Sequence, residues 1–326
     1  MKLVTFEVDG ADHVGVMLHG GTAVLDATSA SGSSDLHSMR GLIDGGEASL
    51  QRLRELLKAA PPAAIRGRDE VRLRAPLPDP IRMRDCTLFI EHLEPGFKAL
   101  ARQEAAAAAD PAVEYQRLIA TGKYDLPAIL RRQPVYYNAD HLAISGPDDV
   151  VLAPPFSQFL DYELEFAVVL GRSGRDISEA EAANFIFGYT IYNDWSLRDV
   201  QADVMRSNLG PGEGKDFDGG TSLGPCIVTR DELMNPYALE MSARVNGEEW
   251  SRGNSATIHH TFERAIAHFS RSKTLYAAEV FGSGTVLSGC GLELGRTLRE
   301  GDIVELEVEG IGVLRNRVSY MKKENT

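Results

Sequence analysis

The stretch LDYELEFAVVLG (Leu160–Gly171) combines an apolar strand pattern with three acidic residues spaced two apart. Side chains alternate across a β-strand, so Asp161, Glu163 and Glu165 are predicted to point to one face. Two carboxylates about 4 Å apart repel each other by roughly 4 kcal/mol at an effective dielectric near 20. From Phe166 to Leu170 the apolar residues follow without alternation, which predicts a strand buried on both faces. Its carboxylates must therefore be protonated, paired with cations or bound to a metal ion.

A second acidic strand pattern gives an internal comparison. In IVELEVEG (Ile303–Gly310) the acidic residues alternate strictly with apolar ones. Such alternation is typical of a strand with one face in water. We therefore expect the three acids of this second strand to be solvated, namely Glu305, Glu307 and Glu309.

Another apolar strand is predicted in FIFGYTIYNDWSLRD (Phe185–Asp199), and Asp194 stands where this strand ends. Hard oxygen ligands of this kind bind Mg²⁺, Mn²⁺ or Ca²⁺ in proteins. Pairing of the acids with Arg198 or Lys215 in a structural network is the alternative explanation. Strand pattern alone leaves both explanations open.

Composition limits the classes of protein to which the chain can belong. It has 326 residues, enough for one large domain or two, with 43% hydrophobic and 25% charged residues. The formal net charge of −13, without a basic block, disfavours nucleic acid as a partner. Three separated cysteines with no zinc-type spacing suit a reducing cytoplasm. The N-terminus resembles a strand, and no apolar run predicts a membrane span, so a cytoplasmic location is expected.

The distribution of strand and helix signals predicts an α+β, β-rich protein in two parts. The Pro-rich APLPDP (Ala75–Pro80) suggests a linker, which gives a small N-terminal α/β domain over 1–75 and a larger domain over 76–326. In the first part, Glu47–Ala60 has helical periodicity. In the second, 91–132 is predicted to be helix-rich, and short strand-like runs follow from Val135 onward.

Four motifs in order resemble the fumarylacetoacetate hydrolase family: LDYELEFAVVLGR, YNDWSLRDVQ, GKDFDGGTSLGP and GSGT. The resemblance covers roughly Ile81–Val318. It implies a catalytic domain with a mixed β-sandwich roll, a homodimer, a small keto-acid substrate and a place in aromatic catabolism. It also implies a divalent cation, commonly Mg²⁺, with Mn²⁺ and Ca²⁺ as alternatives.

The resemblance also assigns roles to individual residues. The implied metal ligands are Glu163, Glu165 and Asp194, with Asp85 in RDCTLFIEH as a further candidate, whereas Asp161 is not a ligand in the family pattern. His92 is the implied general base, and imidazole side chains ordinarily titrate near neutral pH. Lys215 matches a lysine that stabilises an oxyanion. Substrate- or water-positioning roles fall on Gln201, Tyr137 and Thr285.

Several positions depart from the family pattern. In the family, the histidine has a glutamate partner either three residues later or on a distant strand. Here the residue three positions after His92 is Pro95, which leaves the adjacent Glu94 and the distant Glu293 as candidates. A tyrosine before the histidine is Thr87 here, and an expected arginine falls on Ala101. Recognition of the substrate tail is therefore expected to differ from that of fumarylacetoacetate hydrolase itself.

The leading functional hypothesis is a Mg²⁺-dependent hydrolase that cleaves a C–C bond in a 2,4-diketo acid such as an acylpyruvate. A lyase of the same family, either an oxaloacetate-type decarboxylase or a 2-oxo-alkenoate hydratase or isomerase, is the alternative. A non-catalytic metal-dependent keto-acid binder is a third hypothesis, against which His92 and Lys215 count. A metal nuclease is disfavoured by the negative charge.

Overall fold

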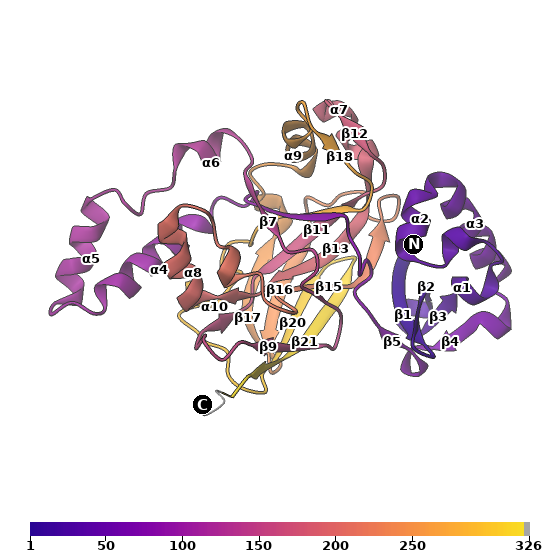
Figure 1. Cartoon of the computed structure of the whole chain (residues 1–326), viewed down its shortest axis with the longest axis horizontal. Coiled ribbons are helices and arrows are strands. Elements are labelled where there is room, and N and C mark those ends of the chain that lie inside the picture. The colour runs from indigo at the N-terminus through magenta and orange to yellow at the C-terminus, as the bar shows by residue number, and fades with distance from the viewer. Residues whose placement is uncertain (323–326) are drawn as a thin grey trace.

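Two β-sheets organise the chain in the computed structural model, which describes residues 1–322 (Figure 1). The larger sheet has twelve strands, ten of them in the order β4 (Ile65–Gly67), β3 (Ala23–Asp26), β2 (Ala11–Leu18), β1 (Lys2–Val8), β15 (Thr221–Thr229), β13 (Ile186–Asp194), β11 (Leu164–Leu170), β19 (Glu279–Gly282), β6 (Arg82–Cys86) and β7 (Tyr136–Ala139). The other two pair at the side of this path, β5 (Arg72–Leu73) with β1 and β8 (Ile144–Ser145) with β15.

The smaller sheet has five strands, in the order β17 (Glu248–Asn254), β16 (Glu240–Val245), β20 (Ile303–Val308), β21 (Gly312–Tyr320) and β9 (Val150–Ala153). Two short ladders complete the pairing, β10 (Leu160–Asp161) with β14 (Ser196–Leu197) and β12 (Gly174–Arg175) with β18 (Thr274–Leu275). The predicted sheet-rich α+β fold is confirmed.

The helices lie around the sheets (Figure 1). Beside the N-terminal strands are α1 (Ala27–Ala30), α2 (Met39–Asp44) and α3 (Gly46–Ala59). The helix-rich stretch predicted over 91–132 contains α4 (Leu93–Ala105), α5 (Pro111–Ala120) and α6 (Ala128–Arg132). The remaining α-helices are α7 (Glu179–Ala182), α8 (Arg198–Val204), α9 (Phe262–Phe269) and α10 (Gly291–Leu294). Helices α8 and α10 lie near α4, and α7 lies next to α9. Within residues 1–322, no helix has both the length and the apolar character needed to cross a bilayer.

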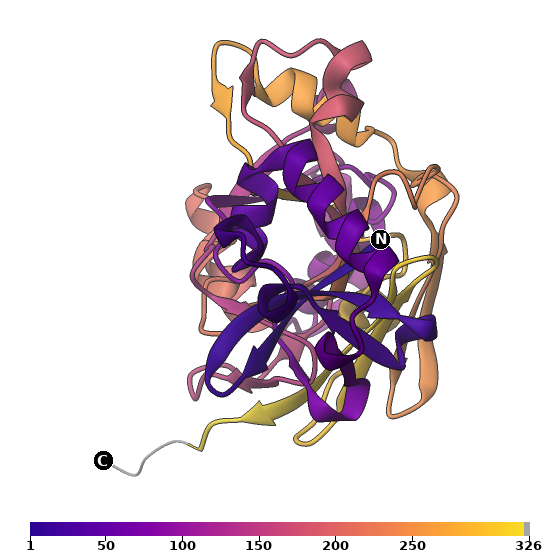
Figure 2. The same ribbon diagram turned by 90° about the vertical axis from the view of Figure 1, so that its right-hand side faces the viewer.

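The N-terminal strands extend the same sheet that carries the rest of the chain. Strand β1 pairs antiparallel with β15 through Lys2 opposite Val228 and Leu3 opposite Ile227. Figure 2 views the molecule from the side on which this N-terminal unit lies. The division into a small domain over 1–75 and a larger one over 76–326 stays a prediction.

A buried carboxylate anchors the first helix of the N-terminal unit. Asp26 caps α1 by accepting a hydrogen bond from the Ser29 N–H (2.9 Å), and it also contacts His13 and the Arg66 Nε (2.9 Å). Although burial opposes ionisation, the hydrogen bonds from Ser29, His13 and Arg66 lower the pKa of Asp26.

Strand β11 runs through the middle of the large sheet, between β13 and β19, and all seven of its residues are buried, as predicted. Leu164, Phe166 and Val168 belong to the apolar core that also contains residues of the small sheet. Ala167 and Val169 belong to the second core, which includes residues of the N-terminal unit. Because faces alternate along a strand, Glu165 shares the face of Ala167.

The comparison strand β20 behaves as expected of a half-solvated strand. Val304, Leu306 and Val308 are buried, while Glu305 and Glu307 are half-buried and contact Arg244 on the neighbouring β16. The predicted solvation of these acids is thus confirmed, with Arg244 as an added partner.

Candidate active site

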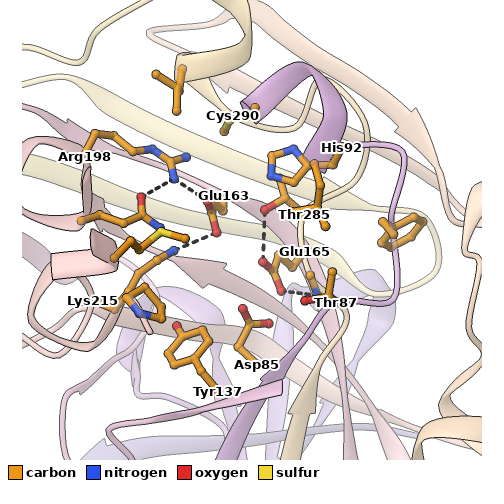
Figure 3. A pocket seen from close by; sticks show the side chains of 18 of the residues that line it. Asp85, Thr87, His92, Tyr137, Glu163, Glu165, Arg198, Lys215, Thr285 and Cys290 are labelled. Carbon is orange, nitrogen blue, oxygen red and sulfur yellow. Dashed lines mark hydrogen bonds and ion pairs between the residues drawn. The ribbon is translucent and has the colours of Figure 1, made fainter. Parts of the chain in front are cut away.

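A cavity of about 290 Å³ lies beside the end of β11, close to the lower limit of about 300–1,000 Å³ for ligand pockets (Figure 3). Its lining comes from β6, β7, β11, α4 and α8 together with the loops around them. All the predicted site residues except Asp194 line this cavity. The structure therefore brings together side chains that are widely separated in the sequence.

Three carboxylates from three strands meet in this region. Asp85 on β6, Glu165 on β11 and Asp194 on β13 each offer an oxygen within 4.8 Å of the others, and all three residues are buried. Strand β19 separates β6 from β11, and Gly282 stands between the two acids. An added Cβ there would lie 2.7 Å from Asp85 Oδ1 and 3.2 Å from Glu165 Oε2. The missing side chain of this glycine is what allows the carboxylates to approach.

Within the described part of the chain one cation, Lys215, contacts this group of three carboxylates, and it pairs with Asp194. Burial and the charge of Asp194 raise the pKa of Asp85 well above its usual range, and burial and Asp85 do the same for Glu165. For Asp194 burial raises the pKa to about 6, although Lys215 acts in the opposite direction. Among residues 1–322, neither Asp85 Oδ1 nor Asp194 Oδ1 has a hydrogen-bond partner. Unpartnered buried oxygens and clustered negative charge fit a divalent cation with oxygen ligands.

Hydrogen bonds hold two of these acids in place. Glu165 accepts from the Gly284 N–H at 2.8 Å and from the Thr285 hydroxyl at 3.3 Å. Asp194 accepts from the Tyr137 hydroxyl at 2.8 Å. Thr285 and Tyr137 were expected to position substrate or water, and both contact carboxylates of the cluster here.

Glu163 lies apart from this cluster, held between two cations. Its Oε1 accepts from Arg198 Nη1 at 2.6 Å and its Oε2 from Lys215 Nζ at 2.9 Å. Burial acts to raise the pKa of Glu163, but the charges of Lys215 and Arg198 outweigh it and hold the pKa below the usual range. Direct metal ligation by Glu163 stays a prediction that requires these ion pairs to rearrange.

Lys215 follows the short turn Gly212–Gly214 and is buried among acceptors. Its Nζ donates to Asp194 Oδ2 at 2.5 Å and to Ser196 Oγ at 2.6 Å, in addition to Glu163. Burial opposes its charge, but Asp194 and Glu163 raise its pKa, so the ammonium form is retained. The nearby Gln201 accepts from Arg198 Nη1 at 3.0 Å. Lys215 therefore fixes the positions of two acids in this structure.

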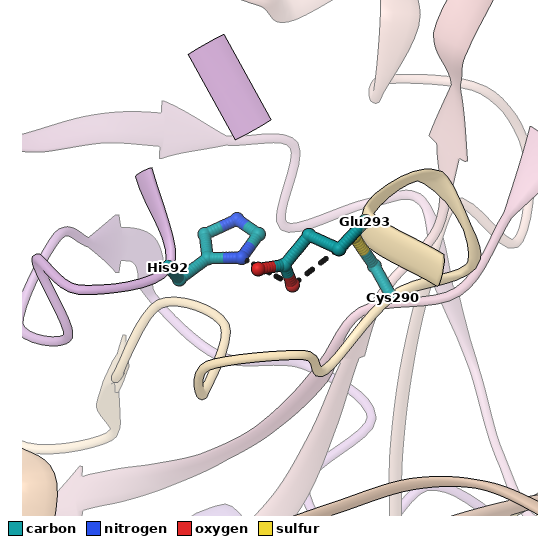
Figure 4. Close-up of side chains that lie close together, drawn as sticks. All are labelled: His92, Cys290 and Glu293. Atoms are coloured by element: carbon teal, nitrogen blue, oxygen red, sulfur yellow. Dashed lines mark hydrogen bonds and ion pairs between the residues drawn. The ribbon is translucent and has the colours of Figure 1, made fainter. Parts of the chain in front are cut away.

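The predicted base has a distant partner. His92, at the start of α4, places Nδ1 2.8 Å from Glu293 Oε2 on α10 (Figure 4). Glu94, the nearer candidate in sequence, instead pairs with Lys98 on the exposed side of α4. Because 201 residues separate His92 from Glu293, local sequence pattern offers no signal for this contact.

Asp161 has a third set of partners. It accepts from the Gly291 N–H at 2.8 Å and the Leu292 N–H at 3.0 Å, at the start of α10, and from Arg198 Nε at 2.8 Å. The three acids of LDYELE thus have different environments: Asp161 binds Arg198 and a helix N-terminus, Glu163 binds two cations, and Glu165 joins the carboxylate cluster. Arg198 and Glu293 are functional candidates to which sequence reasoning assigned no definite role.

Comparison with known proteins identifies related chains. The family model described as fumarylacetoacetate (FAA) hydrolase C-terminal matches residues 105–319. A human mitochondrial oxaloacetate tautomerase is 37% identical over 193 residues, which are 57% of this chain and 59% of that protein. An uncharacterised protein from Archaeoglobus fulgidus is 35% identical over 184 residues, covering 56% of this chain and 68% of the relative. The match thus spans about three-fifths of the human relative's length.

Solved structures share the fold over nearly the whole chain. A fumarylacetoacetate hydrolase from Exiguobacterium antarcticum superposes with a TM-score of 0.71 at 28% identity, covering 98% of this chain and 100% of that one. A maleylpyruvate hydrolase from Sphingobium sp. SYK-6, solved with manganese(II) and pyruvate, has a TM-score of 0.71 at 21% identity over 99% of this chain and 100% of its own. At that identity the second likeness concerns the fold alone.

Proposed function

This chain belongs to the fumarylacetoacetate hydrolase family, and from that membership we propose that it is a divalent-cation-dependent hydrolase of acylpyruvate-type 2,4-dioxo acids. One observation carries the proposal: a single cavity is lined both by His92, which is hydrogen-bonded to Glu293, and by Asp85 and Glu165 of the carboxylate cluster. Hydrolysis of a C–C bond next to a carbonyl needs a base for water and stabilisation of negative charge on the departing group. The cavity offers residues suited to both tasks.

Asp85, Glu165 and Asp194 are the residues that would hold the cation. A bound dication supplies Lewis-acid stabilisation for negative charge on the oxygens of a 2-oxo acid. We propose Mg²⁺, with Mn²⁺ or Ca²⁺ as alternatives, because the donors are all carboxylate oxygens. The Sphingobium hydrolase, which shares the fold, was solved with manganese(II) and pyruvate, so the fold can accommodate a cation and a 2-oxo acid.

His92 is proposed to take a proton from water. In the tautomer that carries its proton on Nδ1, the ring donates to Glu293 Oε2 and leaves the Nε2 lone pair free. Glu293 thereby fixes the ring orientation and stabilises the imidazolium that forms, as a carboxylate does for a catalytic histidine in other hydrolases. The proton on Nε2 is then available for the carbon that leaves as an enolate.

The residues that line the cavity indicate the polarity of the substrate's acyl group. Leu93, Phe97 and Leu100 of α4 line one side, together with Phe89 and Leu292. Among the described residues the cations that line it are Arg198 and Lys215, and each already contacts a carboxylate. A second carboxylate on the substrate would therefore find no free cation in the wall. We accordingly propose a short apolar acyl group on the pyruvate unit.

A tautomerase of oxaloacetate is the second candidate. It is favoured by the names of curated mitochondrial relatives that are 35–37% identical to this chain. The same His92–Glu293 pair would then shuttle a proton between carbon and oxygen of the substrate. The apolar wall counts against it, because oxaloacetate carries a second carboxylate.

Parallel assays with Mg²⁺ and with Mn²⁺ separate the two candidates. Acetylpyruvate and longer acylpyruvates are followed by loss of enol absorbance and by NMR detection of pyruvate and the free acid. Oxaloacetate is followed by its keto–enol exchange. The proposal expects hydrolysis of acylpyruvates that is faster for apolar tails than for fumarylpyruvate. If the protein catalyses keto–enol exchange of oxaloacetate but hydrolyses no acylpyruvate, the hydrolase proposal is rejected in favour of the tautomerase.

A further inference from the structure

A second group of side chains has the composition of a possible metal site, and two of its members, His92 and Cys290, lie on the side of the cavity away from Asp85 (Figure 3). His92, Cys290 and Glu293 each offer a donor atom within 4.8 Å of the others. Glu293 Oε2 is central, at 2.8 Å from His92 Nδ1 and 3.6 Å from Cys290 Sγ (Figure 4). Cys290 caps α10 and Glu293 lies in its only turn, so their spacing of three residues places both on one face.

The donor types of this group differ from those of the carboxylate cluster. A thiolate, an imidazole and a carboxylate form a set that suits Zn²⁺, whereas three carboxylates suit hard cations. Zinc bonds of about 2.0–2.3 Å in a tetrahedron space the donors by about 3.3–3.8 Å. The 3.6 Å distance from Glu293 Oε2 to Cys290 Sγ lies within that range, whereas the 2.8 Å distance to His92 Nδ1 is the shorter one of a hydrogen bond and would have to lengthen. Small side-chain shifts therefore suffice to enclose the ion.

We propose that His92, Cys290 and Glu293 form an inhibitory binding site for Zn²⁺ and similar borderline metal ions, separate from the hard-cation centre. The Cys290 thiol lies next to the His92–Glu293 pair, which is proposed to activate water. The fourth tetrahedral position would remain for water, as is usual in zinc sites with three protein ligands. Metal binding is independent of the enzyme's reaction. Only its inhibitory effect rests on the function proposed for His92.

Binding of zinc at this site replaces protons and hydrogen bonds by metal–ligand bonds and involves no change of oxidation state. Burial raises the pKa of the Cys290 thiol, so the metal-free thiol is protonated and releases one proton when sulfur bonds to zinc. In the metal-free pair the ring proton of His92 is on Nδ1, so metal binding requires the other tautomer: the proton is lost from Nδ1 to water, Nε2 takes one up, and the Nδ1 lone pair bonds to the metal. Glu293 exchanges the hydrogen bonds it accepts for a bond to zinc. With its proton on Nε2, His92 no longer accepts one from water, so turnover stops.

Cobalt(II) provides the direct test, because bonding of thiolate sulfur to Co²⁺ gives a near-ultraviolet charge-transfer absorption that carboxylate ligands do not give. The full-length protein is titrated with Co²⁺ in excess Mg²⁺, as wild type, Cys290→Ala and Cys290→Ser. Cys226→Ala is the matched control, since Cys226 is also buried but lies on β15 outside the cavity. Circular dichroism and thermal unfolding establish that each variant folds.

We expect the absorption in wild type and in Cys226→Ala and its loss in both Cys290 variants. Zn²⁺ should inhibit Mg²⁺-dependent turnover, with at least about tenfold weaker inhibition in Cys290→Ala relative to that variant's own basal rate. Absence of the absorption in wild type, or its persistence in Cys290→Ala, would overturn the site. If the absorption behaves as expected but zinc leaves turnover intact, the site stands as a binding site, and both its inhibitory effect and the role proposed for His92 are rejected.

Discussion

Gly282→Ala is expected to weaken the cation site without removing any ligand. The added Cβ would stand 2.7 Å from Asp85 Oδ1, closer than such atoms approach, and 3.2 Å from Glu165 Oε2. The two carboxylate ends can avoid the added Cβ only by leaving the positions in which they would meet the cation, so we assign the cost of overpacking, about 1–3 kcal/mol, to the ion-bound form. Because each 1.4 kcal/mol is about tenfold in a binding constant, the Mn²⁺ affinity should fall by roughly 5- to 150-fold. Isothermal titration calorimetry of wild type and variant with Mn²⁺ measures this directly.

A neighbouring strand supplies the matched control. At Gly188 on β13 an added Cβ would meet Val228 O at 2.4 Å and Ile227 Cγ2 at 2.6 Å, but no carboxylate. Gly188→Ala should therefore lower the melting temperature while the Mn²⁺ affinity of the folded protein stays within about twofold of wild type. Our placement of the cation is refuted if Gly282→Ala binds Mn²⁺ as tightly as wild type does. Equal loss of affinity in both variants would show that general strain, not the carboxylate approach, is responsible.

Three further perturbations address the acids, the base and the N-terminal cap. Glu165→Gln should weaken Mn²⁺ binding by at least about 100-fold in calorimetry, because it removes a buried carboxylate ligand. As a control, a variant in which the solvated acids Glu305, Glu307 and Glu309 are all replaced by Gln should bind Mn²⁺ as wild type does. His92→Ala should reduce kcat for acylpyruvate hydrolysis by about 10²–10⁴-fold with unchanged Mn²⁺ affinity, and wild-type turnover in this variant would eliminate His92 as the base. Asp26 has a lowered pKa in the folded protein, so its ionised form stabilises the fold above the ordinary aspartate pKa near 4, and this contribution is lost as pH falls through the folded value. Urea unfolding from pH 7 to pH 3 should therefore show a smaller loss of stability for Asp26→Asn than for wild type, and parallel pH profiles would contradict the assignment.

Sequence reasoning predicted the elements of the fold better than their connections. The unbroken apolar run after Glu165 correctly predicts a strand that is buried on both faces, and the alternation around Glu305 predicts a strand with one face exposed to solvent. Both predictions depend only on residues that are adjacent in the sequence of one strand. By contrast, the pairing of β1 with β15 joins segments more than 200 residues apart, which no local pattern encodes.

The same limit applies to the site. Strand periodicity places Asp161, Glu163 and Glu165 on one face, but it does not say which of them receives a cation from elsewhere. Their partners come from α8, from Lys215 after the turn Gly212–Gly214, from β6 and from the start of α10. The family resemblance supplied Asp85 and His92, while the choice of Glu293 over Glu94 needed the three-dimensional contact.

The position of Asp161 has a consequence for how this site can change during evolution. One carboxylate holds both the guanidinium that orients Glu163 and the helix turn that carries Glu293. Gly291 is constrained as well, because a Cβ there would lie 2.6 Å from Asp161 Oδ1. Residues that share a partner in this way have non-additive effects on substitution. A change at Asp161 would therefore disturb the Arg198–Glu163 pair and the start of α10 together, whereas the apolar residues of α4 that line the cavity make no contact with Asp161 among these hydrogen bonds.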